Sequence, residues 1–487
     1  MSRTTRAVRW LPWFVAVAGC GNGALLPIDA ADGPPPVGED AAVDAAAPDA
    51  AAPDAGAPCP AAGGPTMHGG AIAADEVWSA EGNPHVVTTT DLVIAPRAPA
   101  TSATLTLAPC AEVHLPANGS ITIRAGGALV GAGTVAQPVR VRAADPGAPF
   151  AQIHPHSGGT IRLTYTAIDD GGAPGNNDPQ LIGTFDLQGD FLDPGPEPTI
   201  FVDHVILRRS RSNGVVLRDG AGFAPGSTNL VVDGAARFPI LTWARSVGTL
   251  PSGTYGGNGA DEIAINANGR QDAIIADTTM RALGVPYRIG LHSGANLRVG
   301  TDQPDGAVAT LTIEPGVTLR FAPRSGGPAD YGAGMYVQFG GADRPATGAL
   351  IAVGTEAAPI VFTSAADTPA AGDWFGVWFG AIPDPASRVD HARIEYAGSQ
   401  TNAQSIACAP GGPSYSGAIR IFGAPPGEFV THTEIVHSGG NGVDRGWRTD
   451  DAPASFLPTN TITDLAGCRE TFPRRTNNAC PDPVPCP

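Results

Sequence analysis

The chain has 487 residues, of which only 15% are charged, and its formal net charge at pH 7 is −17. This acidic balance speaks against nucleic-acid binding and against a basic groove for polyanionic sugars. All 29 basic residues are arginines, so lysine-based Schiff-base or nucleophilic chemistry is excluded. Glycine (64) and proline (48) are abundant, which favours many short strands joined by turns over helical bundles.

Residues 1–19 have the pattern of an export signal. Arginines at positions 3, 6 and 9 precede an apolar stretch over 10–18 that is too short to span a membrane stably. The sequence Val-Ala-Gly-Cys that ends at Cys20 resembles the lipobox of bacterial lipoproteins. The resemblance implies that residues 1–19 are removed and that Cys20 carries lipid. The alternative is an ordinary secretory signal with an incidental cysteine.

Residues 20–64 predict a disordered linker after the lipidated cysteine. The segment consists mainly of Ala, Pro, Asp and Gly, as in APDAAAPDAGAP, and lacks the apolar content that folding requires. It resembles the linkers of outer-membrane lipoproteins from GC-rich bacteria such as myxobacteria. The resemblance implies an outer-membrane lipoprotein that is periplasmic or exposed at the cell surface.

The body, residues 65–487, contains an internal duplication. Four blocks recur later in the chain in the same order. They begin at Leu105, Gly127, Phe201 and Thr228, and their counterparts begin at Leu311, Gly348, Phe429 and Thr459. This predicts two repeat units, at about 85–300 and 301–470, followed by a C-terminal cap that contains cysteines.

Within each unit, short apolar runs are separated by Gly, Pro, Asn or Asp, which predicts strands without long helices. The phrases LTIEPGVTLRF, GALIAVGT, PIVFTS and VDHARIEYAG resemble those of bacterial exported proteins with a right-handed parallel β-helix of the pectin-lyase-like type. The resemblance implies an all-β solenoid over roughly residues 85–465. Asn213-Gly214 and Asn441-Gly442 are expected at coil corners, with a left-handed Asn that bonds to the next coil.

Six cysteines remain once Cys20 is assigned to lipid: Cys59, Cys110, Cys408, Cys468, Cys480 and Cys486. An even number in an exported chain predicts disulfides, with free thiols or a metal site as the alternatives. Cys59 and Cys110 lie far from the other four, so we expect them to pair. The last four allow three connectivities, and their spacing does not choose among them.

Enzymes of the resembled fold need clustered carboxylates, either to hold Ca²⁺ beside a base or to surround one glycosidic bond. The acidic pairs here are Asp169-Asp170 and Asp450-Asp451, and neither comes with the Asn-Thr-Asp, Gly-His-Gly or Arg-Ile-Lys motifs of polygalacturonases. We therefore predict no catalytic residue and interpret these pairs as turn or cap residues. Asp169, Asp170 and Asp178 lie in DDGGAPGNNDP, where a Ca²⁺ loop is the alternative to a surface loop.

The histidines predict structural roles. His204 and His432 occupy equivalent positions of the two repeats, which indicates a recurring structural position. His154 and His156 alternate on one predicted strand and could share a transition metal, but no third ligand is evident.

The densest aromatic segment is DWFGVWF. Strand alternation predicts Trp374 and Trp378 on one face and Phe375 and Phe379 on the other. Core packing is favoured for these residues, and stacking of exposed Trp on sugar rings is the alternative.

Two function classes remain. The first is a membrane-anchored, non-enzymatic β-helix rod for adhesion, scaffolding or binding of a cell-surface glycan or protein. The second is a polysaccharide lyase or glycoside hydrolase. Convergence of carboxylates with an arginine in one lateral groove would favour the enzyme. No cofactor and no nucleic-acid partner are expected.

Overall fold

The computed structural model describes residues 58–174, 178, 180–190, 197–267, 272–301, 306–327, 330–339, 341, 344–399, 407–409, 412–414, 416–448, 454–477, 479–480 and 486. The chain divides into two compact units, Met1–Asp54 and Ala55–Pro487, and all described residues belong to the second. Cys20, Asp450 and Asp451 lie outside the described residues. The second unit is all-β apart from two 3₁₀ helices, η1 (Ala80–Gly82) and η2 (Ala244–Thr249).

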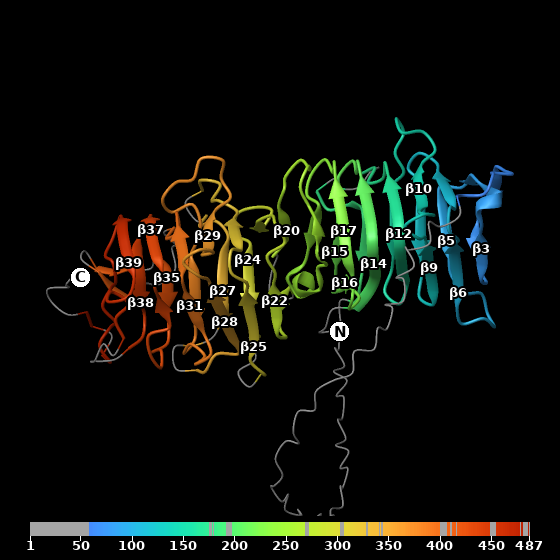
Figure 1. Cartoon of the computed structure of the whole chain (residues 1–487). Helices are drawn as coiled ribbons and strands as arrows, with labels where there is room; N and C mark the ends of the chain where they lie inside the picture. Colours follow the sequence, from blue (N-terminus) through green and yellow to red (C-terminus); the bar gives the residue numbers. More distant parts are fainter. Residues whose placement is uncertain are drawn as a thin grey trace, which may run out of the picture. The chain divides into compact units, whose positions relative to one another are not determined.

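The longest sheet has 14 strands, and we call it the long sheet (Figure 1). Its strands pair in parallel and follow one another in chain order. They are β2 (Ala71–Ile72), β5 (Asp91–Ile94), β8 (Ser120–Ile123), β11 (Gln152–Pro155), β13 (Gly183–Gln188), β15 (Asn213–Arg218), β18 (Ile240–Thr242), β20 (Ile263–Ile265), β23 (Tyr287–Ile289), β26 (Thr318–Phe321), β29 (Ile360–Ser364), β32 (Ala392–Glu395), β37 (Glu434–Ser438) and β39 (Thr461–Leu465).

A 12-stranded parallel sheet, the N-terminal sheet, accompanies the first part of the long sheet. Its strands are β1 (Thr66–His68), β3 (Glu76–Trp78), β4 (His85–Val87), β6 (Ala103–Leu107), β7 (Glu112–Leu115), β9 (Gly127–Ala132), β10 (Val139–Ala143), β12 (Thr160–Asp169), β14 (Glu197–Arg208), β16 (Ala221–Phe223), β17 (Thr228–Asp233) and β19 (Gly253–Thr254). The strands β12 and β14 bend around a corner, so that the first half of β12 pairs with β9 and the second half with β10.

Two parallel sheets accompany the later part of the long sheet. A six-stranded sheet contains β21 (Ala273–Ile274), β24 (Asn296–Val299), β27 (Gly334–Phe339), β30 (Val377–Gly380), β35 (Gly417–Ile421) and β38 (Asn441–Arg445). A five-stranded sheet contains β22 (Thr278–Met280), β25 (Ala309–Ile313), β28 (Gly348–Val353), β31 (Arg388–Asp390) and β36 (Val430–Thr431). The strands β33 (Ala407–Ala409) and β34 (Gly412–Ser414) form a separate antiparallel pair.

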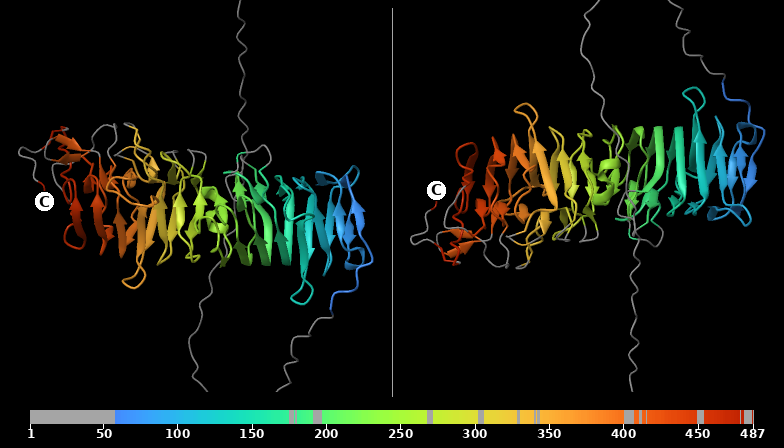
Figure 2. Two further views of the ribbon diagram at one scale, coloured as in Figure 1. Left: turned by 90° about the horizontal axis from the view of Figure 1, so that it is seen from above. Right: turned by 90° about the horizontal axis from the view of Figure 1, so that it is seen from below.

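The order of strand pairing shows that successive turns of the chain, which we call coils, stack in parallel. Consecutive strands β6, β7 and β8 pair with β9, β10 and β11, the strands that occupy the same places in the next turn of the chain. Views of the unit from above and below also show the strands lying side by side along it (Figure 2). This all-β arrangement of long parallel sheets is compatible with a parallel β-helix.

Inward side chains of the long sheet form one continuous column. One buried residue from each strand between β5 and β39 stacks on its partner in the next strand. The column runs Leu92, Ile121, Ile153, Phe185, Val215, Ile240, Ile263, Tyr287, Leu319, Phe362, Ile394, Ile435, Ile462. Strand alternation explains it, because every second residue of each strand turns inward and meets its counterpart one coil away.

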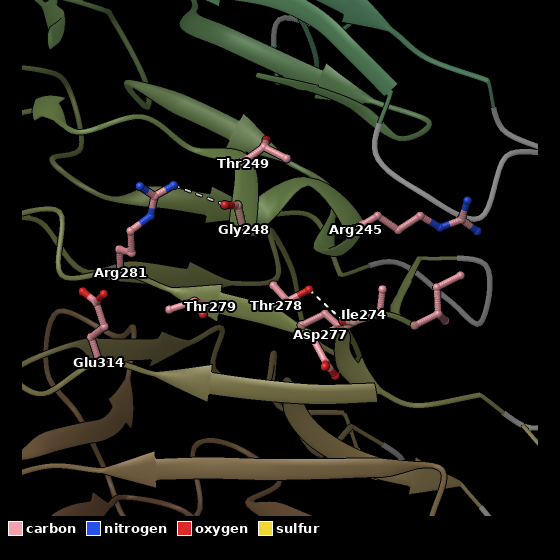
Figure 3. A pocket seen from close by; sticks show the side chains of 11 residues that line it. Arg245, Gly248, Thr249, Ile274, Asp277, Thr278, Thr279, Arg281 and Glu314 are labelled. Atoms are coloured by element: carbon pink, nitrogen blue, oxygen red, sulfur yellow. Dashed lines mark hydrogen bonds between the residues drawn. The ribbon is translucent and has the colours of Figure 1, made fainter. Parts of the chain in front are cut away.

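The accompanying sheets change over within the unit. The N-terminal sheet ends at β19, and the two later sheets begin at β21 and β22, whereas the long sheet continues through this region. The 3₁₀ helix η2 contacts β16 of the N-terminal sheet as well as β21 and β22 of the later sheets. Figure 3 shows Arg245 and Thr249 of this helix beside Thr278 and Thr279 of β22. We call this region the junction.

Two of the recurring sequence blocks form strands that pair in the same register. In the pair β6–β9, Leu105 lies opposite Leu129, and in the pair β25–β28, Leu311 lies opposite Leu350. The division of the body into two repeat units stays a prediction.

The recurring Asn-Gly pairs hold neighbouring coils through the backbone. Asn213 Nδ2 donates to Ile182 O (2.7 Å), and its Oδ1 accepts from Phe238 N (3.3 Å). Asn441 Oδ1 accepts in the same way from Cys468 N (2.7 Å). Neither asparagine has a positive φ, because each begins a strand, so the expected left-handed conformation is wrong.

The aromatic segment is buried, but its faces differ from the prediction. Trp374 stacks on Phe321 in the main core, with ring centroids 4.0 Å apart, and Phe379 also lies in that core. Phe375 and Trp378 instead form a second cluster with Tyr336. The cause is the residue between them, Gly376, whose φ of 112° breaks the alternation before β30 begins.

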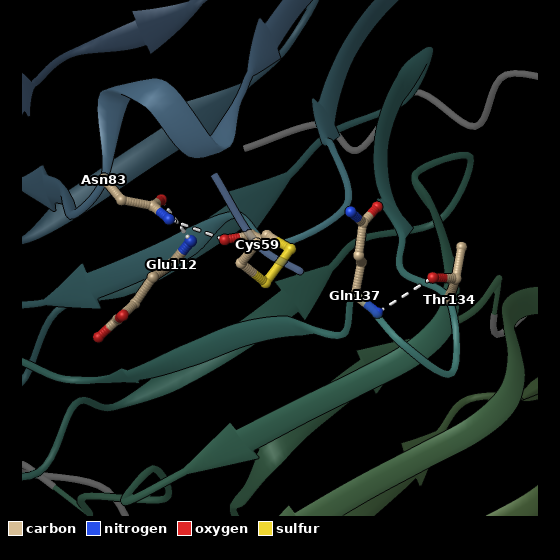
Figure 4. The surroundings of a disulfide bond; sticks show 6 residues. Cys59, Asn83, Glu112, Thr134 and Gln137 are labelled. Atoms are coloured by element: carbon tan, nitrogen blue, oxygen red, sulfur yellow. Dashed lines mark hydrogen bonds between the residues drawn. A yellow bond between two sulfur atoms is a disulfide. The ribbon is translucent and has the colours of Figure 1, made fainter. Parts of the chain in front are cut away.

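Three disulfides tie down the two ends of the unit. Cys59 is bonded to Cys110, as the sequence predicts, while the C-terminal four are joined as Cys408–Cys480 and Cys468–Cys486. Figure 4 shows Asn83 beside the first disulfide. Its Nδ2 donates to Cys110 O and its Oδ1 accepts from Glu112 N, both at 2.7 Å.

We predict that the Cys59→Ser/Cys110→Ser variant loosens only the N-terminal coils. The bond closes a loop with a sequence separation of 51, which corresponds to at most about 4 kcal/mol of chain entropy. Terminal coils have one neighbour and open first. Hydrogen exchange should therefore accelerate in β1–β7 and stay unchanged beyond β20. The matched Cys468→Ser/Cys486→Ser variant should affect β38 and β39 instead, and uniform acceleration in both variants would contradict this.

Candidate ligand-binding groove

A lateral groove lies on the outer face of the N-terminal sheet, with a cavity volume of about 570 Å³. Its floor is a column of outward side chains from β12, β14 and β17, namely Ala167, Ile206 and Val231, which lie opposite one another in register. They alternate with inward residues of the same strands. The floor is apolar because the outward residues here are aliphatic.

The rim of the groove is a corner column in the left-handed conformation. Tyr165, His204 and Asn229 have φ values of 40°, 55° and 53°, and they occupy the same corner on successive coils. The rings of Tyr165 and His204 stack with centroids 4.5 Å apart and an angle of 10° between their planes. Nδ1 of His204 lies 2.7 Å from Oδ1 of Asp203, which orients the imidazole.

Neutral polar groups edge the groove. Thr134 lines one end, and Ser252 and Thr254 line the other. The Ser252 hydroxyl is hydrogen-bonded to the Thr228 hydroxyl at 2.8 Å. The groove therefore combines an apolar floor, a stacked aromatic rim and hydroxyl or amide groups. Among the described residues that line it, Tyr165 and His204 are the two with ionisable side chains.

The repeated histidines both lie in corner columns. His432 has a φ of 45° and stacks on His391, with centroids 4.9 Å apart, just as His204 stacks on Tyr165. Within the described part of the chain, Asp390, His391 and His432 are the His, Cys, Asp or Glu side chains that come close enough together to share a metal ion. Sequence reasoning named His432 but not its two neighbours.

The predicted acidic cluster is divided in space. Asp170 is buried and forms a two-point ion pair with Arg209 on the next coil, at 2.8 and 3.0 Å. The same guanidinium lies 3.3 Å from Asp169. Asp178 instead lines a different pocket, so these three carboxylates do not form a common Ca²⁺ site.

That second pocket, which we call the polar pocket, has a volume of about 380 Å³ beside the long sheet. The carboxylates of Asp178, Asp186 and Asp219 line it together with Arg218 and His154. Arg218 forms a two-point ion pair with Asp186, both contacts at 2.7 Å. This convergence could not be predicted from the sequence, because the residues come from segments that only the register of the coils brings together.

His154 of β11 lines the polar pocket, and His156 follows just after that strand. The rings of His154 and His156 meet edge to face, with centroids 4.4 Å apart. Nδ1 of His154 is hydrogen-bonded to the backbone carbonyl of Asp186. Burial and the neighbouring His154 lower the pKa of His156 below its ordinary value.

A third cavity, of about 560 Å³, lies at the junction and is shown in Figure 3. Three of the four charged residues described in its lining are hydrogen-bonded to backbone groups. Arg281 donates to Leu250 O (2.7 Å), Asp277 accepts from Thr310 N (2.9 Å), and Glu314 accepts from Ala282 N (2.8 Å). These hydrogen bonds hold together the segments at the junction, where the N-terminal sheet ends and the later sheets begin. We therefore interpret this cavity as structural.

Comparison of the chain with models of known protein families, with curated proteins and with solved structures finds no match. The functional argument therefore rests on the groove and the pockets themselves. None of the helices in the described residues has the length and apolar character needed to cross a membrane.

A buried carboxylate beside the junction gives a testable pH dependence. Asp272 is 3% exposed, and no hydrogen bond of normal geometry from the described residues reaches either of its carboxylate oxygens. Burial raises the pKa of Asp272 to about 7, and the backbone of Ala244 and Arg245 with the Arg245 guanidinium lowers it only partly. The folded protein therefore keeps this proton at pH values where the unfolded chain has released it.

We predict that Asp272→Asn stabilises the protein at pH 8. Between about pH 4 and pH 7 the folded state binds more protons than the unfolded state, so wild-type stability falls as the pH rises. The variant avoids this cost, which is of the order of a few kcal/mol above pH 7 and vanishes near pH 4. Denaturant unfolding at pH 4, 6 and 8 measures it, with exposed Asp367→Asn as the control. A gain that is the same at all three pH values would contradict the prediction.

Proposed function

We propose that this chain is an exported lipoprotein, anchored in the outer membrane through lipid on Cys20, that binds glycan without cleaving it. We propose further that its body is a right-handed parallel β-helix of the pectin-lyase-like type, periplasmic or exposed at the cell surface. The observation that carries the binding function is the groove, with its apolar floor and the stacked Tyr165–His204 rim.

The groove has the chemistry that sugar rings require. A pyranose presents an apolar face of C–H groups and a periphery of hydroxyls. The aliphatic floor and the Tyr165 ring suit the apolar face, while Asn229, Ser252 and Thr254 offer hydrogen bonds to hydroxyls. Rim residues recur once per coil, at the strand spacing of about 4.8 Å, so an extended glycan lying along the stack would meet one on each coil.

The charge distribution favours a neutral glycan. The described residues that line the groove include no carboxylate and no arginine, and the chain as a whole carries −17. A polyanionic sugar would find no cation in the groove and would be repelled by the protein's overall field.

We predict that Tyr165→Asn weakens glycan binding by about two- to tenfold, because the loss of one ring contact is worth about 0.5–1.5 kcal/mol. Asparagine tolerates the left-handed corner and already stands at position 229 of the same column. The ligand is found on an array of neutral glycans, and affinities are then compared by calorimetry. Tyr396→Asn is the matched control, since Tyr396 is a left-handed corner residue stacked on His437 outside the groove. Equal affinities of both variants, or no bound glycan, would overturn the proposal.

The polar pocket favours a second candidate, a polysaccharide lyase or glycoside hydrolase. Asp178, Asp186 and Asp219 converge there with Arg218, which is the arrangement that such an enzyme needs. Asp186 is already neutralised by Arg218, so Asp178 and Asp219 are the candidate acid and base. The same purified protein should release no unsaturated or reducing-end products from these glycans. Products that disappear in Asp219→Asn would replace the binding function by the enzyme.

Lipidation has its own test. We predict that the wild-type chain partitions into the detergent phase and that Cys20→Ala partitions into water. Each buried CH₂ group contributes about 0.8 kcal/mol, so two or three acyl chains anchor the protein stably. Aqueous partitioning of both proteins would contradict the anchor without affecting the groove.

A further inference from the structure

A second corner column, remote from the groove in sequence, gathers metal-binding side chains. Asp390 ends β31, His391 follows it at the corner, and His432 lies opposite His391 on the next coil. Both histidines have positive φ values, 48° and 45°. The side chains come from two coils and meet at one point on the surface.

The distances between their ligand atoms match those around a bound metal. Oδ1 of Asp390 lies 2.8 Å from Nδ1 of His432 and 3.2 Å from Nδ1 of His391. Metal–ligand bonds of about 2.0–2.1 Å place neighbouring ligand atoms about 2.9 Å apart in octahedral and about 3.3 Å apart in tetrahedral coordination. All three atoms lie within 4.8 Å of one another.

We propose that Asp390, His391 and His432 form a binding site for one divalent transition-metal ion, which joins the two coils. Two imidazoles and one carboxylate suit Zn²⁺, Ni²⁺ or Cu²⁺ better than Mg²⁺ or Ca²⁺, which prefer oxygen ligands alone. This site is independent of the proposed glycan binding.

Neighbouring groups orient the carboxylate. The Thr431 hydroxyl donates to Oδ1 of Asp390 at 2.9 Å. The neighbouring Arg393 is engaged elsewhere, since it pairs with Glu395 at 2.7 Å and with Glu434. The carboxylate of Asp390 therefore faces the two imidazoles.

Partial exposure leaves room for further ligands. The exposed fractions of the side chains are 27% for Asp390, 37% for His391 and 60% for His432. Water or a ligand from another molecule can complete the coordination, so the site is of the open kind rather than a closed structural centre.

The corner column of Tyr165 and His204 provides an internal contrast. There the counterpart of His432 is His204, but the counterpart of His391 is Tyr165, which stacks on the histidine without offering a nitrogen. The same corner therefore keeps its ring stacking in both places, whereas the second imidazole is present only in the later column.

The test uses the full-length chain, purified without a histidine tag and titrated calorimetrically with NiCl₂ and with MgCl₂ near neutral pH. We expect one Ni²⁺ per chain, no Mg²⁺ binding, and a thermal midpoint that rises with Ni²⁺. His391→Tyr keeps the stacked ring found at Tyr165 but removes the ligand, and Asp390→Asn removes the charge. Each should weaken Ni²⁺ binding by at least about tenfold.

The control is His204→Ala, which should bind Ni²⁺ as the wild type does. Far-UV circular dichroism and the thermal midpoint without metal verify that each variant is folded. Absence of Ni²⁺ binding by the wild type, or binding that survives in His391→Tyr and Asp390→Asn, would overturn the site. Loss of binding in His204→Ala would place the metal in the other column and would equally overturn it.

Discussion

The rest of the structure depends on the stacking of inward side chains along the long sheet. From Leu92 to Ile462, each strand contributes one buried residue that rests on the residue of the neighbouring coil. Each such residue stabilises the fold by about 1.5–3 kcal/mol through burial, and a shift of one residue would turn a whole strand's inward set to water. The column therefore fixes the register of every coil, including those that cross the junction, where the other sheets end.

Once the register is fixed, the corners are fixed as well. Tyr165 and His204 meet because the strands on both sides of the corner are held in register, and the same holds for His391 and His432. Side chains at one corner recur at the strand spacing, so they form rows on the surface rather than isolated groups. Both the groove rim and the proposed metal ligands are such rows.

The sequence predicts the properties that are local. Alternation and turn residues indicate the strands, and the separation of Cys59 and Cys110 from the other cysteines indicates their pairing. Properties that depend on the register between distant segments cannot be predicted from the sequence. The polar pocket is one example, since Asp178, Asp186 and Asp219 come from three segments. The face of Trp378 is another, because the conformation of Gly376 decides it.

The conformation of the corner rings carries a further argument about function. A left-handed φ raises the conformational free energy of a residue other than glycine by about 1–3 kcal/mol, and asparagine tolerates this conformation well. Stacking of a ring pair stabilises the fold by only about 0.5–1.5 kcal/mol. Glycine or asparagine would therefore serve folding at least as well at Tyr165, His204, His391 and His432 as the rings present there. Tyr396 and His437 form a stacked pair in the same conformation outside the groove. The proposed sugar contacts and metal ligation therefore rest on what surrounds each column, which is an apolar floor beside Tyr165 and His204 and the carboxylate of Asp390 beside His391 and His432.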